Sequence, residues 1–381
     1  MTAGEPLRLL HFTDSLEPSG VGEHVYLLAR ELAAQGCRQA LVCPETPAGR
    51  SLLERCAALG MEVYPWRVRS EADARDYKRL VRLLDTRRFD LVHNHIGITW
   101  EGCWGTFAAA EAGVPVICTE HLPYLITDPA ERALKLQASR RVAGTIAVSH
   151  GVAASLLAHR LVRPDRVHVV WNGIDLARFR GERRPEQRCA LLGIDRDQAL
   201  VVCVARLTPQ KGHATLLQAV AQLRRTRPGV VVALAGDGPL QAELQQMAAA
   251  LDLASAVRFL GRYPDVPALL SCADVLVQPS TFEGLPLAVL EGMAATLPVI
   301  VTDTIGNRET VVHNQSGLIV PPNDANALAA ALERVLSDPA LAAQLGRQAR
   351  RRVEREFVAP VMARRTYGVY RRTLQAIRAA A

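Results

Sequence analysis

The amino-acid sequence predicts an α/β protein built from two doubly wound, parallel-sheet domains of the Rossmann-like type. The chain has 381 residues, more than a single hydrophobic core usually supports, so two domains are expected. Short apolar runs alternate with longer segments of helical apolar spacing, as they do in βαβ units. Hydrophobic residues make up 49% of the chain and charged residues 22%, which excludes disordered and fibrous classes.

The first half contains predicted strands at residues 7–12, 39–43, 91–93, 116–119, 145–148 and 167–170. A helix is predicted over residues 24–34, where apolar residues recur at helical spacing, and it closes at Gly36. The polar, irregular stretch at residues 176–198 is predicted to be the linker between domains.

The second half repeats the same alternation of predicted strands and helices after the linker. Strands are predicted at residues 200–204, 230–235, 257–260, 275–278, 299–302 and 318–320. The tail at residues 325–353 is predicted to be helical, and a further helical pattern, interrupted by Pro360, ends near Arg378. Each half is thus expected to form its own sheet.

Charge and cysteine usage bear on location and partners. The formal net charge is +7, with arginines spread along helical segments; solvated helix faces explain this best, and contact with an anionic membrane surface stays open. No apolar run is long enough to span a bilayer, so we expect a cytoplasmic protein, with peripheral contact at the inner face of the membrane left open. The eight cysteines show no metal-binding or disulfide spacing. Buried free thiols are expected.

Two glycines follow the first predicted strand, in the stretch Ser19-Gly20-Val21-Gly22. Glycines allow close approach to a phosphate, and the following helix N-terminus favours negative charge. The stretch is not the dinucleotide-binding fingerprint, because Val25 occupies the position of its third glycine. Phosphate or sugar contact and a simple tight turn remain equally good interpretations.

Histidines also gather at predicted strand ends in the first half. His93 and His95 should share one face of their strand and Asn94 the other. No third metal ligand is evident from the spacing, so we expect polar lining of a cleft and no metal. His121 follows another strand and has the chemistry to bind a sugar hydroxyl, although a lone histidine is more often structural.

The second half carries cations and carboxylates after its strands. Arg206 and Lys211 lie in "ARLTPQKG" before a helix and suit a diphosphate clamp, and "AGDGP" at residues 235–239 adds a glycine turn. Glu283 precedes a helix that begins near Leu287, and Glu291 lies inside that helix, at most about 12 Å further along. We expect one carboxylate to bind a sugar and the other a ribose diol. The alternative is a capping acid and a solvated acid, but the helix has little polar face.

Several of these stretches resemble a known family. "VARLTPQKG", "LAGDGP", "FLGRYPDVPALLSCADVLVQPSTFEGLPLAVLEGMAATLPVIVTD" and "GNRETVVHNQSGLIVPPND" look like the retaining glycosyltransferases of family 4, which have the GT-B fold. The resemblance implies two Rossmann-like domains that face a central cleft. It implies an acceptor-binding domain at residues 1–178, a donor-binding domain at residues 179–360, and a C-terminal helix, 361–381, that packs back on the first domain.

The resemblance also implies roles for individual residues. Glu283 and Glu291 match the family's pair of glutamates, on the donor sugar and the nucleotide ribose, and Arg206 and Lys211 match its diphosphate clamp. His121 matches a histidine beside the donor sugar. The implied catalytic residues are His121, Arg206, Lys211 and Glu283. The implied donor-binding residues are Gly20, Val21, Gly22, Arg206, Lys211, Gly236, Arg262, Tyr263, Glu283, Gly284, Leu285, Pro286, Leu287 and Glu291. The segment Ile305-Gly306-Asn307 departs from the family's usual paired glycines.

The implied reaction moves a sugar from a UDP- or GDP-type donor to a hydroxyl acceptor, with retention and front-face attack. No cofactor or metal is expected, because the only Asp-x-Asp match, Asp195-Arg196-Asp197, precedes a strand and is predicted to be a turn. The acceptor is a small molecule, a glycan or a lipid-linked molecule, and nucleic acid is not expected. A nucleotide-sugar 2-epimerase and a non-catalytic sugar-nucleotide-binding protein remain the alternatives.

Overall fold

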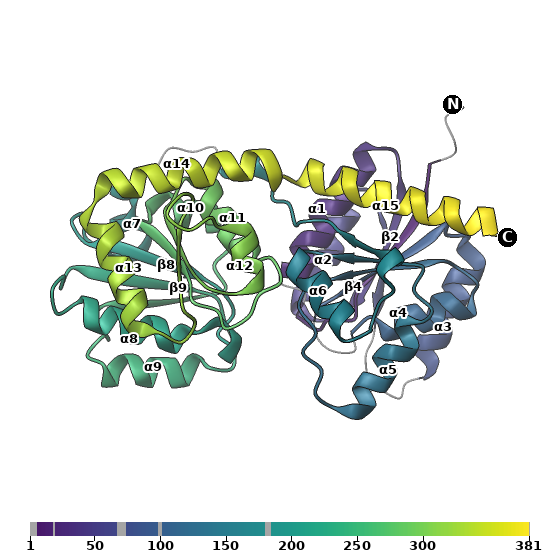
Figure 1. The fold of residues 1–381 in the computed structure, drawn as a ribbon, viewed down its shortest axis with the longest axis horizontal. Helices are drawn as coiled ribbons and strands as arrows, with labels where there is room; N and C mark the ends of the chain where they lie inside the picture. Colours follow the sequence, from purple (N-terminus) through teal and green to yellow (C-terminus); the bar gives the residue numbers. More distant parts are fainter. Residues whose placement is uncertain (1–5, 18–19, 67–73, 98–100, 180–183, 381) are drawn as a thin grey trace. The chain divides into compact units, whose positions relative to one another are not determined.

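A computed structural model of the chain describes residues 6–17, 20–66, 74–97, 101–179 and 184–380. The chain divides into two compact units, one formed by Met1–Gly173 with Ala359–Ala381 and the other by Ile174–Val358 (Figure 1). The chain leaves the first unit shortly before the boundary predicted at residue 178. It returns to that unit shortly before the boundary predicted at residue 360.

The first unit is built on a seven-stranded parallel sheet with the order β3-β2-β1-β4-β5-β6-β7. Its strands are β1 (Arg8–Phe12), β2 (Arg38–Pro44), β3 (Glu62–Trp66), β4 (Leu91–Ile96), β5 (Val116–Glu120), β6 (Gly144–Ala147) and β7 (Val167–Val169). Sequence reasoning missed β3, because this edge strand is half-exposed and contains Pro65, so it does not read as an apolar run. It also ended β4 too early, since polar side chains fill that strand's buried second half.

Helices cover both faces of this sheet. They are α1 (Gly20–Ala34), α2 (Pro47–Ala57), α3 (Ala74–Arg87), α4 (Cys103–Glu111), α5 (Pro129–Ser139), α6 (His150–Ala158) and α15 (Ala359–Ala380). The C-terminal helix α15, yellow in Figure 1, packs beside α1. Its Met362, Val369 and Tyr370 share one buried cluster with Leu9 of β1 and Leu27 of α1. The last helix of the chain therefore completes the core of the first unit.

The second unit has a six-stranded parallel sheet with the order β10-β9-β8-β11-β12-β13. Its strands are β8 (Ala199–Val204), β9 (Val230–Ala235), β10 (Val257–Gly261), β11 (Val275–Gln278), β12 (Val299–Thr302) and β13 (Leu318–Val320). Its helices are α7 (Arg188–Leu192), α8 (His213–Leu223), α9 (Gln241–Ala250), α10 (Val266–Cys272), α11 (Leu287–Ala294), α12 (Ile305–Thr310), α13 (Ala325–Ser337) and α14 (Pro339–Glu356). The strands are rich in valine and leucine and largely buried, as expected for a parallel sheet covered on both faces.

Two predictions about this unit need correction. The stretch predicted as a linker, residues 176–198, belongs to the second unit and contains short 3₁₀ turns and α7. The tail predicted as one helix is two, because α13 stops at Asp338. That side chain caps α14 by accepting a hydrogen bond from the Leu341 amide, and Pro339 begins the new helix.

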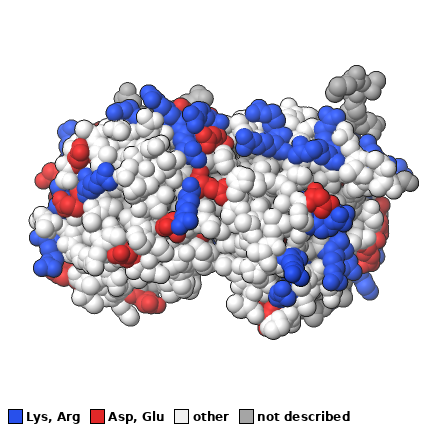
Figure 2. All heavy atoms as spheres, viewed as in Figure 1, with Lys and Arg blue, Asp and Glu red and all other residues white. Residues whose placement is uncertain are grey.

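The surface carries basic side chains over a few helices, and on the face shown in Figure 2 they gather over α14, α15 and α3. On α3, Leu80 and Leu84 are buried, and the basic residues in or just after the helix are exposed: Lys78, Arg79, Arg82, Arg87 and Arg88. Within the described ranges no helix combines the length and apolar character that crossing a membrane requires. The seven cysteines whose side chains are described are free and buried, as predicted.

Candidate active site

Polar residues meet where the strand order of the second sheet reverses. Strands β8 and β11 are neighbours at the centre of this sheet, and the chain proceeds from them toward opposite edges. Ligands of open parallel sheets bind outside the carboxyl ends of the strands at such a switch point. Arg206 and Lys211 follow β8, and Ser280 and Glu283 follow β11. Arg206, Lys211 and Glu283, which were selected from the sequence, therefore come from two adjacent strand ends.

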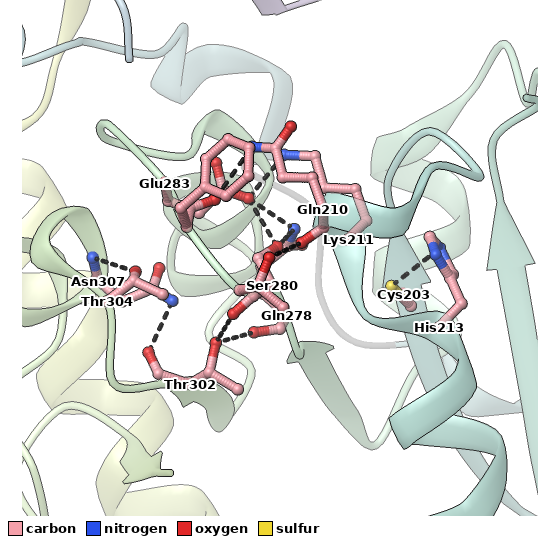
Figure 3. A network of polar contacts seen from close by, with 12 residues as sticks. Cys203, Gln210, Lys211, His213, Gln278, Ser280, Glu283, Thr302, Thr304 and Asn307 are labelled. Atoms are coloured by element: carbon pink, nitrogen blue, oxygen red, sulfur yellow. Dashed lines mark hydrogen bonds and ion pairs between the residues drawn. The ribbon is translucent and has the colours of Figure 1, made fainter. Parts of the chain in front are cut away.

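Glu283 and Lys211 form a largely buried ion pair at this position (Figure 3). The Lys211 Nζ atom lies 2.6 Å from Glu283 Oε1, and the side chains are 16% and 4% exposed. The same carboxylate oxygen accepts hydrogen bonds from Ser280 Oγ at 2.7 Å and from Gln278 Nε2 at 3.2 Å. Three donors on one oxygen hold the Glu283 side chain in a single orientation, as a positioned catalytic or binding group requires.

The loop that carries Lys211 is tied to the loop that carries Glu283. The Thr281 amide donates to the Gln210 carbonyl at 2.8 Å, and Gln210 Nε2 donates to the Phe282 carbonyl at 3.0 Å. Gly212 ends the short 3₁₀ turn before α8 with φ of 66°, where a β-carbon would overlap the Pro279 carbonyl. Only glycine allows the two loops to approach this closely.

A third loop supports Glu283 from below. Thr302 at the end of β12 donates through Oγ1 to the Ser280 carbonyl, and Asn307 Nδ2 donates to the Thr302 carbonyl at 2.8 Å. Gly306 lies in the first turn of α12, and a β-carbon there would overlap the Gly284 carbonyl. The segment that departs from the family's paired glycines thus keeps glycine at the position that touches the Glu283 loop.

Helix α11 starts directly after this loop and leaves its N-terminus uncapped. Pro286 is the N-cap residue and its side chain accepts no hydrogen bond. The first amides of α11 are therefore available to an anion. Glu291 lies one turn further in and is partly exposed. Val289, Leu290 and Met293 around it are fully buried, in agreement with the small polar face expected for this helix, and Glu291 itself is neither fully enclosed nor on a fully solvated face.

The predicted base contacts lie at the ends of β9 and β10. The Gly236 amide donates to the Gly261 carbonyl at 2.8 Å, which joins the two strand ends. Next to them, Arg262 Nε lies 3.5 Å from Asp237 Oδ2, and both side chains are more than half exposed. Tyr263 is partly buried. The Asp195-Arg196-Asp197 segment is an exposed turn before β8, as predicted.

In the first unit, the predicted glycine loop has a different structure. Gly20, Val21 and Gly22 already form the first turn of α1, four residues before the predicted helix start. Ser19 lies outside the described residues. The helix begins earlier because its first amides need no intrahelical partner, so glycine is tolerated there.

Five histidines of the first unit are buried and lie together, so they do not line an open cleft as predicted. His11 (β1), His24 (α1), His93 and His95 (β4) and His121 (after β5) are each no more than 8% exposed. The His93 and His95 ring centroids are 4.1 Å apart, whereas Asn94 donates a hydrogen bond to the Gly102 carbonyl. This confirms the prediction that the two histidines share one face of β4 and Asn94 lies on the other. Burial lowers the pKa of all five imidazoles, to about 4 for His11 and His24. The cluster is therefore neutral at physiological pH.

Sequence reasoning missed several residues of both groups. It did not select Gln278, Ser280 or Gln210, which position Glu283, because short polar residues after a strand carry no distinctive spacing. It used His24 only to start a helix and gave His11 no role. The in-register pairing of His11 with His93 on adjacent strands requires the sheet order, which no local pattern contains.

Comparisons with known proteins place this fold and site in a class. Two family models divide the chain: Glycosyltransferase Family 4 matches residues 18–178, and Glycosyl transferases group 1 matches residues 188–352. The alpha-maltose-1-phosphate synthase of Mycolicibacterium smegmatis is 33% identical over 311 residues, 74% of this chain and 79% of that protein. The UDP-Gal:alpha-D-GlcNAc-diphosphoundecaprenol alpha-1,3-galactosyltransferase of Escherichia coli is 29% identical over 280 residues, 71% of this chain and 72% of that protein.

Solved structures share the fold. The Anabaena protein HepE in complex with UDP and glucose has a TM-score of 0.84 at 20% identity, with coverage of 95% of this chain and 98% of that one. The two Rossmann-like units have the GT-B fold. The family models and the similar glycosyltransferases identify an enzyme that transfers sugars. The chain belongs to glycosyltransferase family 4, and the group 1 model lies within its second unit.

Proposed function

We propose that this glycosyltransferase moves a sugar from a nucleoside-diphosphate sugar, of the UDP or GDP type, to a hydroxyl acceptor, with retention of configuration. The observation that carries the proposal is the Lys211–Glu283 pair beside the uncapped N-terminus of α11. It places a cation, a fixed carboxylate and free backbone amides at one switch point. These are the groups that a sugar diphosphate needs.

Each group has a role in this proposal. Arg206, Lys211 and the first amides of α11 stabilise the charge that develops on the departing diphosphate, so the transfer requires no metal. Glu283 accepts hydrogen bonds from donor-sugar hydroxyls through its second oxygen, since Oε1 is already engaged. Glu291 binds the ribose diol; its partial exposure suits a ligand contact. Gly236, Arg262 and Tyr263 lie at the strand ends that the nucleoside base contacts.

The first unit takes the acceptor in this proposal, with Gly20–Gly22 near the phosphates and His121 beside the sugar. The galactosyltransferase of Escherichia coli acts on a lipid-linked acceptor according to its name. By analogy, the acceptor here is lipid-linked or a glycan. The exposed basic residues of α3 then provide peripheral contact with an anionic membrane on the cytoplasmic side.

The first test is thermal unfolding of the purified protein with a panel of nucleoside diphosphates and nucleotide sugars. A ligand present at ~100 times its dissociation constant adds about 2.7 kcal/mol, or a few degrees in Tm. We expect a shift with one base family, which Glu291→Ala abolishes. The matched control is Glu243→Ala, which removes an exposed glutamate of α9 in the same unit. No shift with any nucleotide would overturn the donor site.

A second experiment tests the chemistry. The purified enzyme is incubated with the donor that shifts Tm and with small-molecule, glycan and lipid-linked acceptors, with and without EDTA. NMR of the product reports the anomeric configuration. Retention with full activity in EDTA is the expected result. An inverted product contradicts the retaining mechanism, and a 2-epimer of the donor formed without acceptor identifies an epimerase.

A further inference from the structure

Three histidines of the buried cluster in the first unit each carry a ring nitrogen that has no hydrogen-bond partner among the described residues. These atoms are His24 Nε2, His95 Nδ1 and His121 Nε2. The side chains are 2%, 0% and 8% exposed, so bulk water does not reach them. Each of the three residues offers one ring nitrogen, and these nitrogens lie within 4.8 Å of one another. Buried polar atoms are rarely left without a partner, so this group calls for an explanation.

Hydrogen bonds on the far side of the rings determine which nitrogen carries the proton. His24 Nδ1 lies 2.9 Å from Asn172 Oδ1, which only accepts, so Nδ1 is protonated and Nε2 has a free lone pair. This is the arrangement in which metal-binding histidines are found: one nitrogen donates to an oxygen and the other faces the ion. His24 therefore has the tautomer of a ligand.

A longer chain of hydrogen bonds gives His95 the same character. Gln39 Nε2 donates to the Ala29 carbonyl at 2.8 Å, so Gln39 Oε1 faces His11 and accepts from His11 Nε2 at 3.0 Å. His11 Nδ1 then carries a lone pair and accepts from His95 Nε2 at 3.1 Å. The proton of His95 is thus on Nε2, and its Nδ1 lone pair is free.

We propose that His24, His95 and His121 form a binding site for a late first-row divalent metal ion, with Zn²⁺ as the preferred ion. Three neutral imidazoles without a carboxylate are a ligand set for zinc or its neighbours, not for magnesium or calcium. His24 and His95 present two lone pairs, and His121 presents a third when its proton is on Nδ1. A water molecule has two hydrogens and cannot satisfy all three, whereas one cation does. The nitrogens of a tetrahedral zinc site lie about 3.3 Å apart, so small ring rotations close the site. A fourth position remains for water or another ligand.

A second group, His11, His93 and His95, also lies within ligand distance, but both ring nitrogens of His11 and of His93 already have hydrogen-bond partners. His93 Nε2 lies 2.7 Å from Thr119 Oγ1, and His93 Nδ1 lies 2.5 Å from the Tyr370 hydroxyl of α15. His11 is bonded through both nitrogens. A metal ion bound to this second group would have to break these hydrogen bonds. We therefore place the proposed ion at His24, His95 and His121. The low pKa values of all five rings keep them neutral and available near pH 7.

The test is metal binding by the full chain, purified without a histidine tag and treated with a chelator. We expect one equivalent of Zn²⁺ per chain in competition with a chromophoric chelator, and a visible Co²⁺ spectrum typical of nitrogen ligands. His24→Gln and His121→Gln should weaken binding by more than about 100-fold, and Asn172→Ala, which removes the acceptor of the outer nitrogen of His24, by about 10-fold. His168→Gln, in β7 of the same unit, is the matched control and should bind like the wild type.

Circular dichroism and Tm without metal show whether each variant folds. X-ray absorption of the Zn²⁺-loaded wild type keeps the test decisive if the variants do not fold, because it should show nitrogen ligands at about 2.0–2.1 Å. The proposal is overturned if the wild type binds no stoichiometric ion or only several weak ones. It is also overturned if binding survives both His24→Gln and His121→Gln, or if His93→Gln alone abolishes it. All three ligands lie within the first unit. His121 also stands beside the donor sugar in the proposed function, but Zn²⁺ binding is measured without a nucleotide, so failure of the metal site and failure of the donor site are distinguishable.

Discussion

The two units use the same architecture to place opposite kinds of polar groups at the ends of their strands. At the switch point of the second sheet, Lys211 and Glu283 are charged and held by loops outside the strands. At the switch point of the first sheet, between β1 and β4, the polar groups are neutral imidazoles within the strands themselves. Charges need donors and some water, and neutral rings tolerate full burial. The same fold therefore supports an ionic site in one unit and a neutral, tautomer-fixed site in the other.

The largest expected effect that tests this comparison is acid sensitivity of the first unit. Its five buried histidines have pKa values below the ordinary 6.5, chiefly because of burial. Above pH 6.5 both the folded and the unfolded histidines are neutral, so their contribution to stability is complete. As the pH falls toward 4, only the unfolded chain takes up protons, and the free energy of unfolding drops by about 1.4 kcal/mol per pH unit for each histidine.

Asp14 in the same unit acts in the opposite direction, because burial raises its pKa to about 7 and its contribution is lost as the pH rises. One carboxyl does not offset five histidines. In the second unit, His213 also has a pKa lowered to about 4. Hydrogen exchange followed by mass spectrometry between pH 7 and pH 4.5 should therefore show the first unit opening first. Equal exchange in both units at every pH would contradict the comparison.

The next effect separates a structural ion pair from a functional one. Each unit has a buried lysine–glutamate pair: Lys135–Glu120 at 2.8 Å in the first and Lys211–Glu283 in the second. Glutamine in place of Glu120 leaves Lys135, which is only 4% exposed, without a counter-charge, at a cost on the order of 3 kcal/mol. Glu283→Gln should cost less stability, because Lys211 retains some water, but should lower the transfer rate at least about 100-fold.

Urea unfolding and donor turnover of Glu120→Gln and Glu283→Gln measure this difference together. A Glu283→Gln enzyme that transfers sugar at the wild-type rate would show that the second pair is structural. A well-folded Glu120→Gln enzyme without activity would show that the first pair is functional.

A smaller effect concerns the close approach of α12 to the donor loop. Gly306→Ala introduces a β-carbon against the Gly284 carbonyl and should cost about 1–3 kcal/mol, with weaker donor binding. Gly229→Ala is the control in the same unit, since a β-carbon there meets nothing within 4 Å, and it should be neutral or slightly stabilising. Thermal unfolding with and without nucleotide reports both. If the two variants behave alike, close packing at Gly306 does not shape the site.

The smallest expected effect is at the exposed pair Arg262–Asp237. Because both side chains are more than half exposed, Arg262→Ala should change the free energy of unfolding by less than about 0.5 kcal/mol. Nucleotide affinity should fall no more than about threefold if the base is bound mainly through the backbone. Calorimetric titration checks this, and a tenfold loss would assign the Arg262 side chain to the base.

The second unit was more predictable from the sequence than the first. The predicted bounds of β9, β11, β12 and β13 match the structure, because these strands are continuous apolar runs that end at polar, glycine or proline residues. The elements of the first unit are harder to predict, because β3 is half-exposed, β4 continues through His93 and His95, and α1 begins at glycine residues. The Lys211–Glu283 contact joins residues 72 positions apart. It follows only from the adjacency of β8 and β11, which is a property of the whole sheet.

The first unit is made of two segments that are separated in the sequence by the whole second unit, and this sets the order in which the parts are synthesised. The second unit is one uninterrupted segment, Ile174–Val358, and all of it is synthesised before the last helix. The first unit's core stays open until α15, the final 22-residue helix, brings Tyr370 against His93. During synthesis the second unit is therefore complete before the first, and the nascent first sheet stays partly uncovered until α15 has been made.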